Sequence, residues 1–399
     1  MVVMSNPRKT SKSGPPHVAC IIETSMVFGR EMLRGVAQYL QENGPWSVYI
    51  EQRSLMDPAP PWLRTWDGDG IISRLPPSET RRLRATGLCT VDLNDQGPGP
   101  CRPDIQSDHR AEAALAARHL LERGFTCFAF FGYPQFGWSR DCLDGFTATL
   151  QAAGHPAHIY RRAQRVSWGH QQLSWEVEVD GVAQWIHSLP KPLGLMACND
   201  FRGIQALDAC RRAGIAVPEE VAVIGVDNEE LVCTLAYPPL SSVVPDARRI
   251  GYEAAALLDR LMKGEPEPTT PHSIPPLKVV TRRSTEISAI ADPDVAEAMR
   301  FIREHACEGI RVDDVLSRVP VSRSVLQRRF RSLLGRSIHT VIVGVRMQRA
   351  KELLVETDLS LSDIAERTGF THVEYFSAVF RQAFGLPPGA YRLEHLLLS

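Results

Sequence analysis

The sequence lacks the features of a membrane protein and of a disulfide-bonded secreted module. No apolar run approaches the about 18 residues that a transmembrane helix needs. The nine cysteines form no C-x-x-C pair, and several lie inside apolar runs, which is typical of reduced, mostly buried thiols. Residues 1–16 contain no apolar h-region. We therefore expect a disordered tail rather than a signal peptide, and a cytoplasmic protein.

The sequence also lacks the motifs of the common enzyme classes. It contains no G-x-S-x-G, no P-loop and no complete dinucleotide-binding fingerprint. We therefore predict that the protein is not an enzyme and uses no cofactor and no metal. The net charge of −1 says little about partners, because local charges of opposite sign cancel in the sum.

What the sequence does contain is one short pattern twice, in the last hundred residues. The first copy spans residues 312–334 and the second spans 361–384, and a glycine follows each. Each copy predicts a short helix, a tight turn and a second helix that a hydroxyl caps, at Ser322 or Thr371. This is the pattern of a helix-turn-helix, whose second helix enters the major groove of DNA.

A cluster of positive charge covers the first copy. From Arg318 to Lys351 there are nine Arg or Lys and no Asp or Glu. A charge run is usually a solvated face, but this one covers the second helix of a helix-turn-helix, where DNA phosphates would lie. The tandem units therefore predict a transcription factor that binds double-stranded promoter DNA.

Longer stretches of the two units carry a family resemblance. They are S-R-S-V-L-Q-R-R-F in the first unit, L-S-D-I-A-E-R-T-G-F and Y-F-S-A-V-F-R-Q-A-F-G in the second, and P-P-G-A-Y-R after it. Through them, residues 295–393 resemble the DNA-binding domain of the AraC/XylS family. The resemblance implies an all-α domain at 294–395 that, in an activator, also contacts RNA polymerase.

Spacing separates the buried and exposed faces of each second helix. Leu326 and Phe330, like Phe376 and Phe380, lie four residues apart and predict a buried stripe. The polar residues on the other faces are our candidates for DNA contact. They are Arg323, Ser324, Gln327, Arg328, Arg331 and Arg336 in the first unit, and His372, Glu374, Ser377 and Arg381 in the second.

The first unit has the richer reading face. We expect Ser324, Gln327 and Arg328 to face bases, because Arg pairs bidentately with guanine and Gln with adenine. We expect Arg323, Arg331 and Arg336 to hold phosphates. In the second unit Ala378 stands where the family usually has a polar or basic residue. Glu374 is as well placed to stabilise its own helix start as to accept from a cytosine amine.

Short apolar runs alternate with amphipathic stretches from residue 17 to the proline-rich segment 264–276. The runs predict strands at 18–22, 47–51, 70–73, 89–93, 127–131, 193–197 and 221–226. The stretches predict helices at 29–42, 78–86, 109–123, 139–153, 175–188, 201–213 and 246–263. This alternation indicates α/β architecture with parallel sheets. The proline-rich segment predicts no regular structure, 277–281 fits a last edge strand, and 283–293 reads as a linker.

Four stretches of this half carry a second resemblance, at 116–132, 196–207, 213–230 and 238–255. They resemble the periplasmic-binding-protein-like sensor of the LacI/galactose-repressor family. The resemblance implies two α/β lobes over residues 17–282, with a sugar bound between them. The combination with an AraC-type domain resembles the xylose-operon activators. It implies a homodimeric activator of carbohydrate genes that responds to a pentose such as xylose.

Polar and aromatic residues at the predicted strand ends are the candidate sugar ligands. They are Glu23, Trp138, Arg140, Asn199, Asp200 and Asp227. By the family match, Asn199 and Asp227 are the best ligands for hydroxyl groups. Asp108 and Asp200 are equally well placed to cap helices.

One position departs from the family pattern. Cys142 stands where the family usually places a sugar-binding Arg, and Arg140 replaces it only if the helix start shifts. The sequence therefore leaves open a diverged sensor with a non-pentose ligand. A solute-binding receptor for transport is the other alternative, which the absent signal peptide and the DNA-binding domain oppose.

Overall fold

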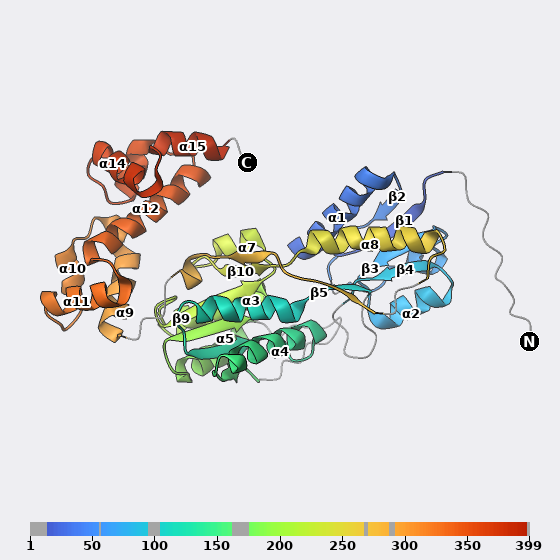
Figure 1. The fold of residues 1–399 in the computed structure, drawn as a ribbon, viewed down its shortest axis with the longest axis horizontal. Helices are drawn as coiled ribbons and strands as arrows, with labels where there is room; N and C mark the ends of the chain where they lie inside the picture. Colours follow the sequence, from blue (N-terminus) through green and yellow to red (C-terminus); the bar gives the residue numbers. More distant parts are fainter. Residues whose placement is uncertain are drawn as a thin grey trace, which may run out of the picture. The chain divides into compact units, whose positions relative to one another are not determined.

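A computed structural model describes residues 14–55, 57–94, 104–161, 175–266, 270–286 and 292–396. The chain divides into two compact units, with the boundary between Ile287 and Ser288 (Figure 1). The N-terminal unit is α/β and the C-terminal unit is all-α, as predicted. Each unit is described separately below.

The first lobe of the N-terminal unit is built on a four-stranded parallel sheet. Its strand order is β2-β1-β3-β4, with β1 (His17–Ile21), β2 (Ser47–Ile50), β3 (Gly70–Ser73) and β4 (Cys89–Asp92). Helices α1 (Val27–Asn43) and α8 (Ala247–Met262) cover one face, and α2 (Pro77–Ala85) covers the other. Side chains that alternate along β1 divide between these two cores, as the period of a strand requires.

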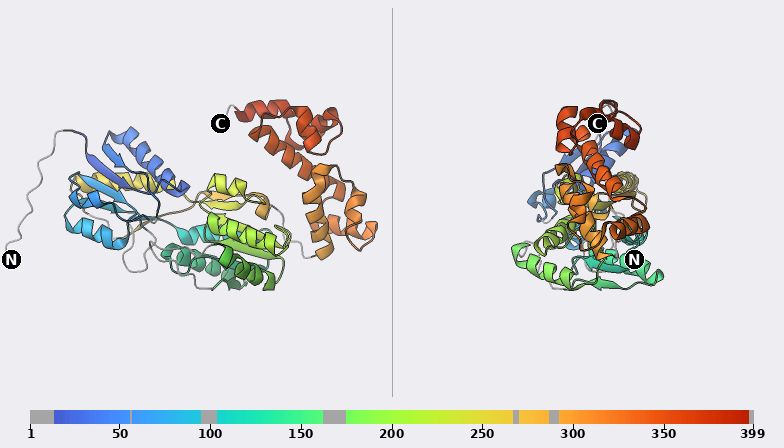
Figure 2. Two further views of the ribbon diagram at one scale, coloured as in Figure 1. Left: turned by 180° about the vertical axis from the view of Figure 1, so that it is seen from behind. Right: turned by 90° about the vertical axis from the view of Figure 1, so that its left-hand side faces the viewer.

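Helices α1 and α8 approach each other unusually closely, and both views show them side by side (Figures 1 and 2; α1 blue, α8 yellow). Two glycines make the approach sterically feasible. A Cβ atom at Gly35 would lie 1.9 Å from the carbonyl oxygen of Arg248, and one at Gly251 would lie 1.8 Å from that of Met32. No real side chain tolerates such distances, so any larger residue must push the helices apart.

We expect Gly251→Ala to destabilise the N-terminal unit by ~1–3 kcal/mol or more, the cost of overpacking a tight contact. All seven tryptophans belong to this unit, so urea denaturation followed by tryptophan fluorescence measures the loss. Gly344→Ala is the control, since a Cβ there meets nothing within 4 Å and Gly344 lies in the other unit. An unchanged midpoint for Gly251→Ala would contradict the close packing of α1 on α8.

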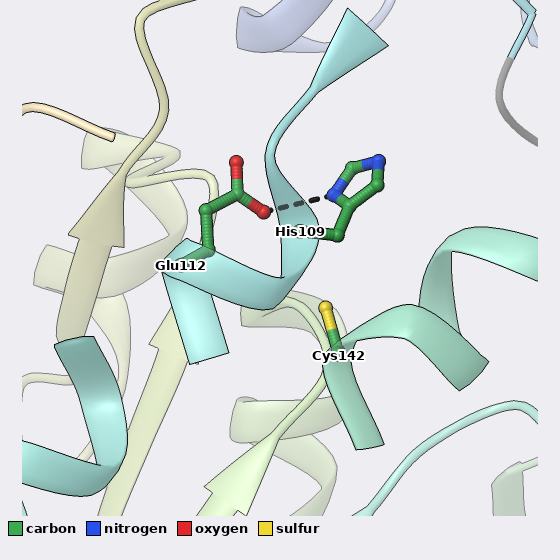
Figure 3. Close-up of side chains that lie close together, drawn as sticks. All are labelled: His109, Glu112 and Cys142. Atoms are coloured by element: carbon green, nitrogen blue, oxygen red, sulfur yellow. Dashed lines mark hydrogen bonds and ion pairs between the residues drawn. The ribbon is translucent and has the colours of Figure 1, made fainter. Parts of the chain in front are cut away.

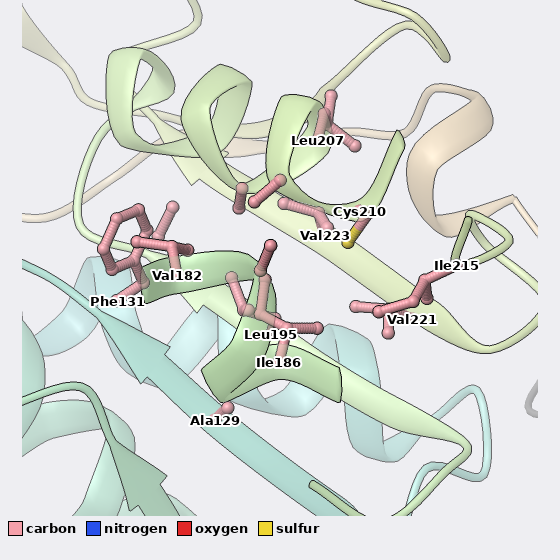
Figure 4. Close-up of a cluster of buried hydrophobic side chains, with 14 of the residues drawn as sticks. Ala129, Phe131, Val182, Ile186, Leu195, Leu207, Cys210, Ile215, Val221 and Val223 are labelled. Atoms are coloured by element: carbon pink, nitrogen blue, oxygen red, sulfur yellow. The ribbon is translucent and has the colours of Figure 1, made fainter. Parts of the chain in front are cut away.

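The second lobe is built on a six-stranded sheet of order β12-β10-β9-β8-β6-β7. Its strands are β6 (Cys127–Phe131), β7 (Ala157–Ile159), β8 (Leu193–Ala197), β9 (Val221–Val226), β10 (Ser241–Val244) and the antiparallel edge strand β12 (Lys278–Val280). The helices are α3 (His109–Leu121), α4 (Gly137–Ala152), α5 (Trp175–Ser188), α6 (Asp200–Arg212) and α7 (Glu230–Leu235). Figure 4 shows α5 and α6 packing Val182, Ile186 and Leu207 onto one sheet face.

The chain passes between the lobes three times, and two of the passages pair with each other. Strand β5 (Ile105–Ser107) leads from the first lobe into α3, and β11 (His272–Ile274) leads from α8 towards β12. The two strands form a parallel pair. The prediction of no regular structure over 264–276 was therefore wrong at β11. Three residues fit between the flanking prolines, where the amide of His272 donates to the carbonyl of Asp104 at 2.8 Å.

The C-terminal unit contains seven α-helices within its described residues. They are α9 (Pro293–His305), α10 (Val312–Leu316), α11 (Arg323–Leu334), α12 (Ile338–Glu356), α13 (Leu361–Arg367), α14 (Val373–Phe384) and α15 (Pro388–Leu396). Helices α10–α11 and α13–α14 are the two helix-turn-helix units. Their second helices end at Gly335 and Gly385, with φ of 65° and 81°, a left-handed conformation that glycine adopts readily.

The long helix α12 joins the two helix-turn-helix units. Its buried residues do not form a single stripe, because those near its start and those near its end face different directions. Towards its start, Arg346 donates to the carbonyl oxygens of Ala306 and Ile310, beside α9. Towards its end, Ala350 and Leu354 pack into the core of the second unit. The two halves of α12 thus pack different faces against different neighbours, so no single apolar stripe runs along the helix.

Candidate functional site

A cleft lies between the two lobes of the N-terminal unit, at the carboxyl ends of their strands. This is the usual place for a ligand site in open α/β sheets. Its polar lining comprises Glu23, Arg74, His109, Glu112, Asn199 and Asp227. Its apolar lining comprises Met26, Phe28, Leu55, Trp138, Cys198 and Val226. Four of the six predicted ligands therefore meet in one cleft.

The wall from the first lobe contains a buried ion pair. Glu23 follows β1 and is 1% exposed, and its carboxylate accepts a hydrogen bond from the guanidinium of Arg74, which directly follows β3. The guanidinium also lies 4.9 Å from the ring centre of Phe28. Sequence reasoning missed Arg74, although its position just after a predicted strand was a usable signal. Arg74 gives the cleft a guanidinium although Cys142 occupies the expected position.

Asp227 directly follows β9 and lies on the opposite wall. Its φ is 103° and that of Asn228 is 49°, so two consecutive non-glycine residues occupy the left-handed half of backbone space. Such strain persists where the surrounding structure enforces it, and it often marks a functional site. Burial raises the pKa of the Asp227 carboxyl well above its ordinary value, and the neighbouring carboxylates of Asp200 and Glu112 add to the rise. The group is therefore poised to gain from a polar ligand.

Asn199 and Asp200 have separate tasks at the start of α6. Asn199 is the N-cap, and its Oδ1 accepts from the amide of Arg202 at 3.0 Å. Asp200 is 1% exposed and does not line the cleft. Its carboxylate instead accepts from the Ser242 hydroxyl at 2.6 Å and from the amide of Glu229 at 2.8 Å. The geometry does not support Asp200 as a ligand, because protein donors already surround it.

Burial raises the pKa of Asp200 from an ordinary value of 3.8 to about 7, although the hydrogen bonds to the carboxylate act to lower it. Between these values the folded state binds more protons than the unfolded state, so this carboxyl makes stability fall as pH rises. We expect the stability of Asp200→Asn relative to the parent to increase from pH 5 to pH 8, by at most ~1.4 kcal/mol per pH unit. Urea denaturation at several pH values measures the difference. Parallel pH profiles for the two proteins would contradict this assignment.

Trp138 and Arg140 both follow β6, but they point to different places. Trp138 lines the cleft and stacks on Phe136, with ring centres 6.0 Å apart and an interplanar angle of 13°. Arg140 is exposed and lies outside the cleft lining. Its guanidinium donates to the carbonyl oxygen of Pro134 at 3.2 Å, in the loop just before α4. The geometry therefore does not support Arg140 as a ligand.

His109 and Glu112 begin α3 and were also missed from the sequence. The His109 Nδ1 atom lies 2.9 Å from Glu112 Oε2. Figure 3 shows this contact with Cys142 close by. The three groups have ligand atoms within 4.8 Å of one another. However, Glu112 also accepts from Ser107, and burial raises the pKa of the Cys142 thiol well above its ordinary value. The cluster therefore suits hydrogen bonding to a neutral polar ligand better than metal coordination, which needs a thiolate.

In the C-terminal unit the expected core is confirmed. Leu326, Phe330, Phe376 and Phe380 are each 0% exposed. All ten predicted DNA-contacting residues are at least partly accessible, with Gln327 and Ser377 half-buried and the others exposed. The prediction of a Thr371 cap was wrong, because the N-cap of α14 is His372. Ser322 holds the N-cap position of α11, but its hydroxyl makes no capping bond.

The two adjacent arginines of α11 have different surroundings. Arg328 is exposed, whereas Arg329 pairs with Asp292 at 3.1 Å and with Asp294 at 2.8 Å at the start of α9. Arg323 is exposed and pairs with Asp313 at 2.9 Å. Arg329 thus fastens α11 to α9, and Arg328 and Arg331 remain accessible to a ligand outside the unit.

Within the described residues, no helix combines the length and apolar character needed to cross a bilayer. Two family models match the chain. A periplasmic binding protein-like domain matches residues 117–285, and a helix-turn-helix domain matches residues 316–394.

The chain is also similar to proteins of known name over nearly its whole length. It is 33% identical to the xylose operon regulatory protein of Escherichia coli strain K12 over 392 residues, 94% of this chain and 96% of that protein. It is 34% identical to the protein of the same name from Haemophilus influenzae, over 94% of this chain and 98% of that protein. A solved structure of a xylose-binding transcription activator has 32% identity and a TM-score of 0.78, over 95% of this chain and 98% of that one.

Proposed function

Because the chain belongs to the family of the xylose operon regulatory proteins, we propose that it is a sugar-responsive, sequence-specific DNA-binding transcription regulator. One observation carries the proposal: a single similarity, at 33% identity, spans both the unit with the cleft and the unit with the two helix-turn-helix motifs. A receptor for transport would need the first unit only. An enzyme is opposed by the same similarity, because the relatives that match over nearly the whole chain are named as regulators.

We propose a pentose such as xylose as the effector. Sugar hydroxyls need carboxylates, amides and guanidinium groups, and Glu23, Arg74, Asn199 and Asp227 offer all three around one cleft. The indole of Trp138 suits the C–H face of a sugar ring. His109 and Glu112 supply a further donor and acceptor where Cys142 leaves a short side chain. A non-pentose ligand is the second candidate, because Cys142 departs from the usual family residue.

Sugar binding acts on DNA binding through the arrangement of the lobes. A ligand that contacts both walls of the cleft binds the closed arrangement more tightly than an open one, and so favours closure. Closure then changes how the DNA-binding units of a homodimer meet their half-sites. The sugar has this effect only to the extent that its affinity differs between the two arrangements. We propose activation of carbohydrate genes because the structural relative is named a xylose-binding transcription activator. An activator would also contact RNA polymerase.

Homodimer formation has support in an exposed apolar surface on the second lobe. Leu231, Leu235 and Tyr237, on and just after α7, are 67%, 76% and 72% exposed. Large apolar side chains gathered on a surface often mark an interface. Such a dimer would work in the cytoplasm, where chromosomal DNA is accessible.

For DNA, we propose the roles that the first helix-turn-helix predicts. Ser324, Gln327 and Arg328 read bases, and Arg323, Arg331 and Arg336 hold phosphates. His372, Glu374, Ser377 and Arg381 on α14 contact a second, less strongly read site.

Calorimetric titration of the full chain with D-xylose, L-arabinose, D-ribose, D-glucose and D-galactose tests the effector. We expect saturable heat with a pentose and the tightest binding for D-xylose. Tighter binding of a hexose would favour the second candidate, a non-pentose ligand, over a pentose. No heat and no thermal shift with any of the five sugars would refute a sugar sensor of this kind, whatever the DNA binding.

A further inference from the structure

Helix α1 in the first lobe has no N-terminal cap of its own. The helix begins at Val27, its N-cap residue is Met26, and no acidic residue lies in its first turn. The first amides of any helix have no partner within the helix and must find one elsewhere. The amide of Val27 finds it in the second lobe, where it donates to Oε2 of Glu229 at 2.6 Å. A carboxylate at this end of a helix also interacts favourably with the helix dipole.

The same carboxylate forms an ion pair with the first lobe. Arg30 Nη2 lies 3.0 Å from Glu229 Oε1, and the side chains of Arg30 and Glu229 are 42% and 13% exposed. Arg30 also donates to the carbonyl oxygen of Thr24 at 3.2 Å, which fixes the guanidinium against its own lobe. Glu229 thus contacts the first lobe with both oxygens, one at an amide and one at a cation. We call these contacts of Glu229 with Val27 and Arg30 the inter-lobe latch.

The second lobe holds Glu229 firmly in place. The amide of Glu229 donates to Asp200 Oδ2 at 2.8 Å, and the amide of Asn228 donates to Ser242 Oγ at 3.0 Å. Asn228 Oδ1 accepts from Arg282 Nη2 at 2.9 Å. These bonds enforce the two left-handed residues that precede Glu229. The latch therefore connects a helix end of one lobe to a rigid turn of the other.

Both segments that form the latch also line the cleft. Met26 and Phe28 flank Val27 and belong to the cleft lining on the first lobe. Asp227 lies two residues before Glu229 and belongs to the lining on the second lobe. Glu229 itself is not part of that lining. A ligand in the cleft thus touches the immediate neighbours of the latch on both sides.

We propose that Glu229 is a positioning residue that holds the two lobes together on the effector and thereby sets its affinity, without touching it. In a closed unit the carboxylate satisfies the end of α1 and the charge of Arg30. When the lobes separate, all three groups lose these contacts. The latch therefore stabilises the same arrangement that a ligand favours. The identification of the effector as a sugar rests on the proposed function, whereas the latch rests on the contacts alone.

The binding experiment uses three variants of the full chain and D-xylose as the probe. We expect Glu229→Ala to weaken D-xylose binding ~10-fold or more, the usual effect of losing a hydrogen bond to a charged group. The loss should lie in a faster dissociation rate, since the site itself is unchanged. Glu229→Gln keeps an oxygen for Val27 and should lose less. Glu230→Gln is the matched control, one residue along on an exposed side chain, and should bind within twofold of the parent.

A double-mutant cycle separates a latch from an unspecific effect of each substitution. Arg30→Met should weaken binding in the parent but have little further effect in Glu229→Ala, because the pair acts as a unit. Fully additive losses, or unchanged affinity in Glu229→Ala, would overturn the proposal.

Hydrogen exchange without sugar tests the latch independently of the effector. We expect the amides of the first turn of α1 to exchange faster in Glu229→Ala than in the parent, and at the parent rate in Glu230→Gln. A substitution in the second lobe would then expose a helix end in the first. Unchanged exchange in Glu229→Ala would overturn the latch. If the parent binds no sugar, the proposed function fails, and the exchange result still decides whether the latch exists.

Discussion

Asp227→Ala is expected to abolish the sugar response and to leave DNA binding intact. Asp227 lies in the cleft lining at the end of β9, and its backbone adopts φ of 103°. A buried sugar hydroxyl that loses its partner at the Asp227 carboxyl costs ~1–3 kcal/mol. Loss of the two hydrogen bonds that this carboxyl offers therefore weakens sugar binding ~100-fold or more. The DNA-binding residues lie in the other unit and keep their own contacts.

Calorimetry with D-xylose and DNA-binding titrations on the same preparation measure both effects. Asp227→Asn is an informative second variant, because Asn tolerates the left-handed backbone while an amide group replaces one carboxyl oxygen. We expect it to retain part of the affinity. Asp141→Ala, on an exposed part of α4, serves as the control and should bind sugar as the parent does. Parent-like sugar affinity in Asp227→Ala would remove Asp227 from the site.

The second large effect is expected at Arg328 on α11. Arg328→Ala should lower the preference for the specific site over random DNA by ~1–3 kcal/mol, the contribution of one bidentate base contact. Arg331→Ala should instead weaken binding to all sequences alike, and reduce the salt dependence by about one phosphate contact. Both residues are exposed arginines on the same helix, so a difference between the two variants reflects their contacts with DNA and not the loss of a positive charge alone.

Anisotropy titrations of specific and random duplexes at several salt concentrations distinguish these outcomes. Arg329→Ala is the matched third variant, because Arg329 pairs with Asp292 and Asp294 inside the unit. It should lower the stability of the C-terminal unit more than its site preference. Equal losses on specific and random DNA for both Arg328→Ala and Arg331→Ala would contradict the assignment of bases to one and phosphates to the other.

The long elements of the fold could be predicted because their periodicity is strong. Every predicted strand and helix of the N-terminal unit is present, with ends within two residues of the prediction. The elements that were missed are short, such as β5 (Ile105–Ser107) and β7 (Ala157–Ile159). Three residues contain too few alternations to show a period. Their pairing partners, far away in the sequence, determine that they are strands.

The same limits explain which residues of the candidate site could be predicted from the sequence. Glu23 and Asp227 were found because they follow long, recognisable strands. His109 follows β5 closely, and since β5 itself was invisible, nothing placed His109 at the end of a strand. A residue that follows a strand lies at a known edge of the sheet, but its place in the sequence does not determine the direction in which its side chain points. Arg140 lies two residues beyond Trp138 on α4, about 200° further around the helix, and therefore points away from the cleft.

Ser284 and Thr285 show how tertiary contacts override local composition. We expected both in the linker, but they are 0% exposed within the N-terminal unit. Ser284 Oγ donates to the carbonyl oxygen of Val223 at 2.6 Å, and Thr285 Oγ1 donates to Ser241 Oγ at 2.7 Å. We therefore propose that the linker begins after Thr285. No local pattern announces these contacts, because both partners belong to strands more than forty residues earlier.

A change in DNA affinity on sugar binding is the defining property of a regulator of this kind. The most direct measurement selects duplexes from a random library with the full chain, and then titrates the enriched site and a scrambled duplex with and without D-xylose. We expect salt-dependent binding whose affinity for the enriched site changes about fivefold or more with D-xylose, and no change for the scrambled duplex. Identical curves with and without D-xylose, or no binding at low salt, would contradict a sugar-responsive DNA-binding regulator.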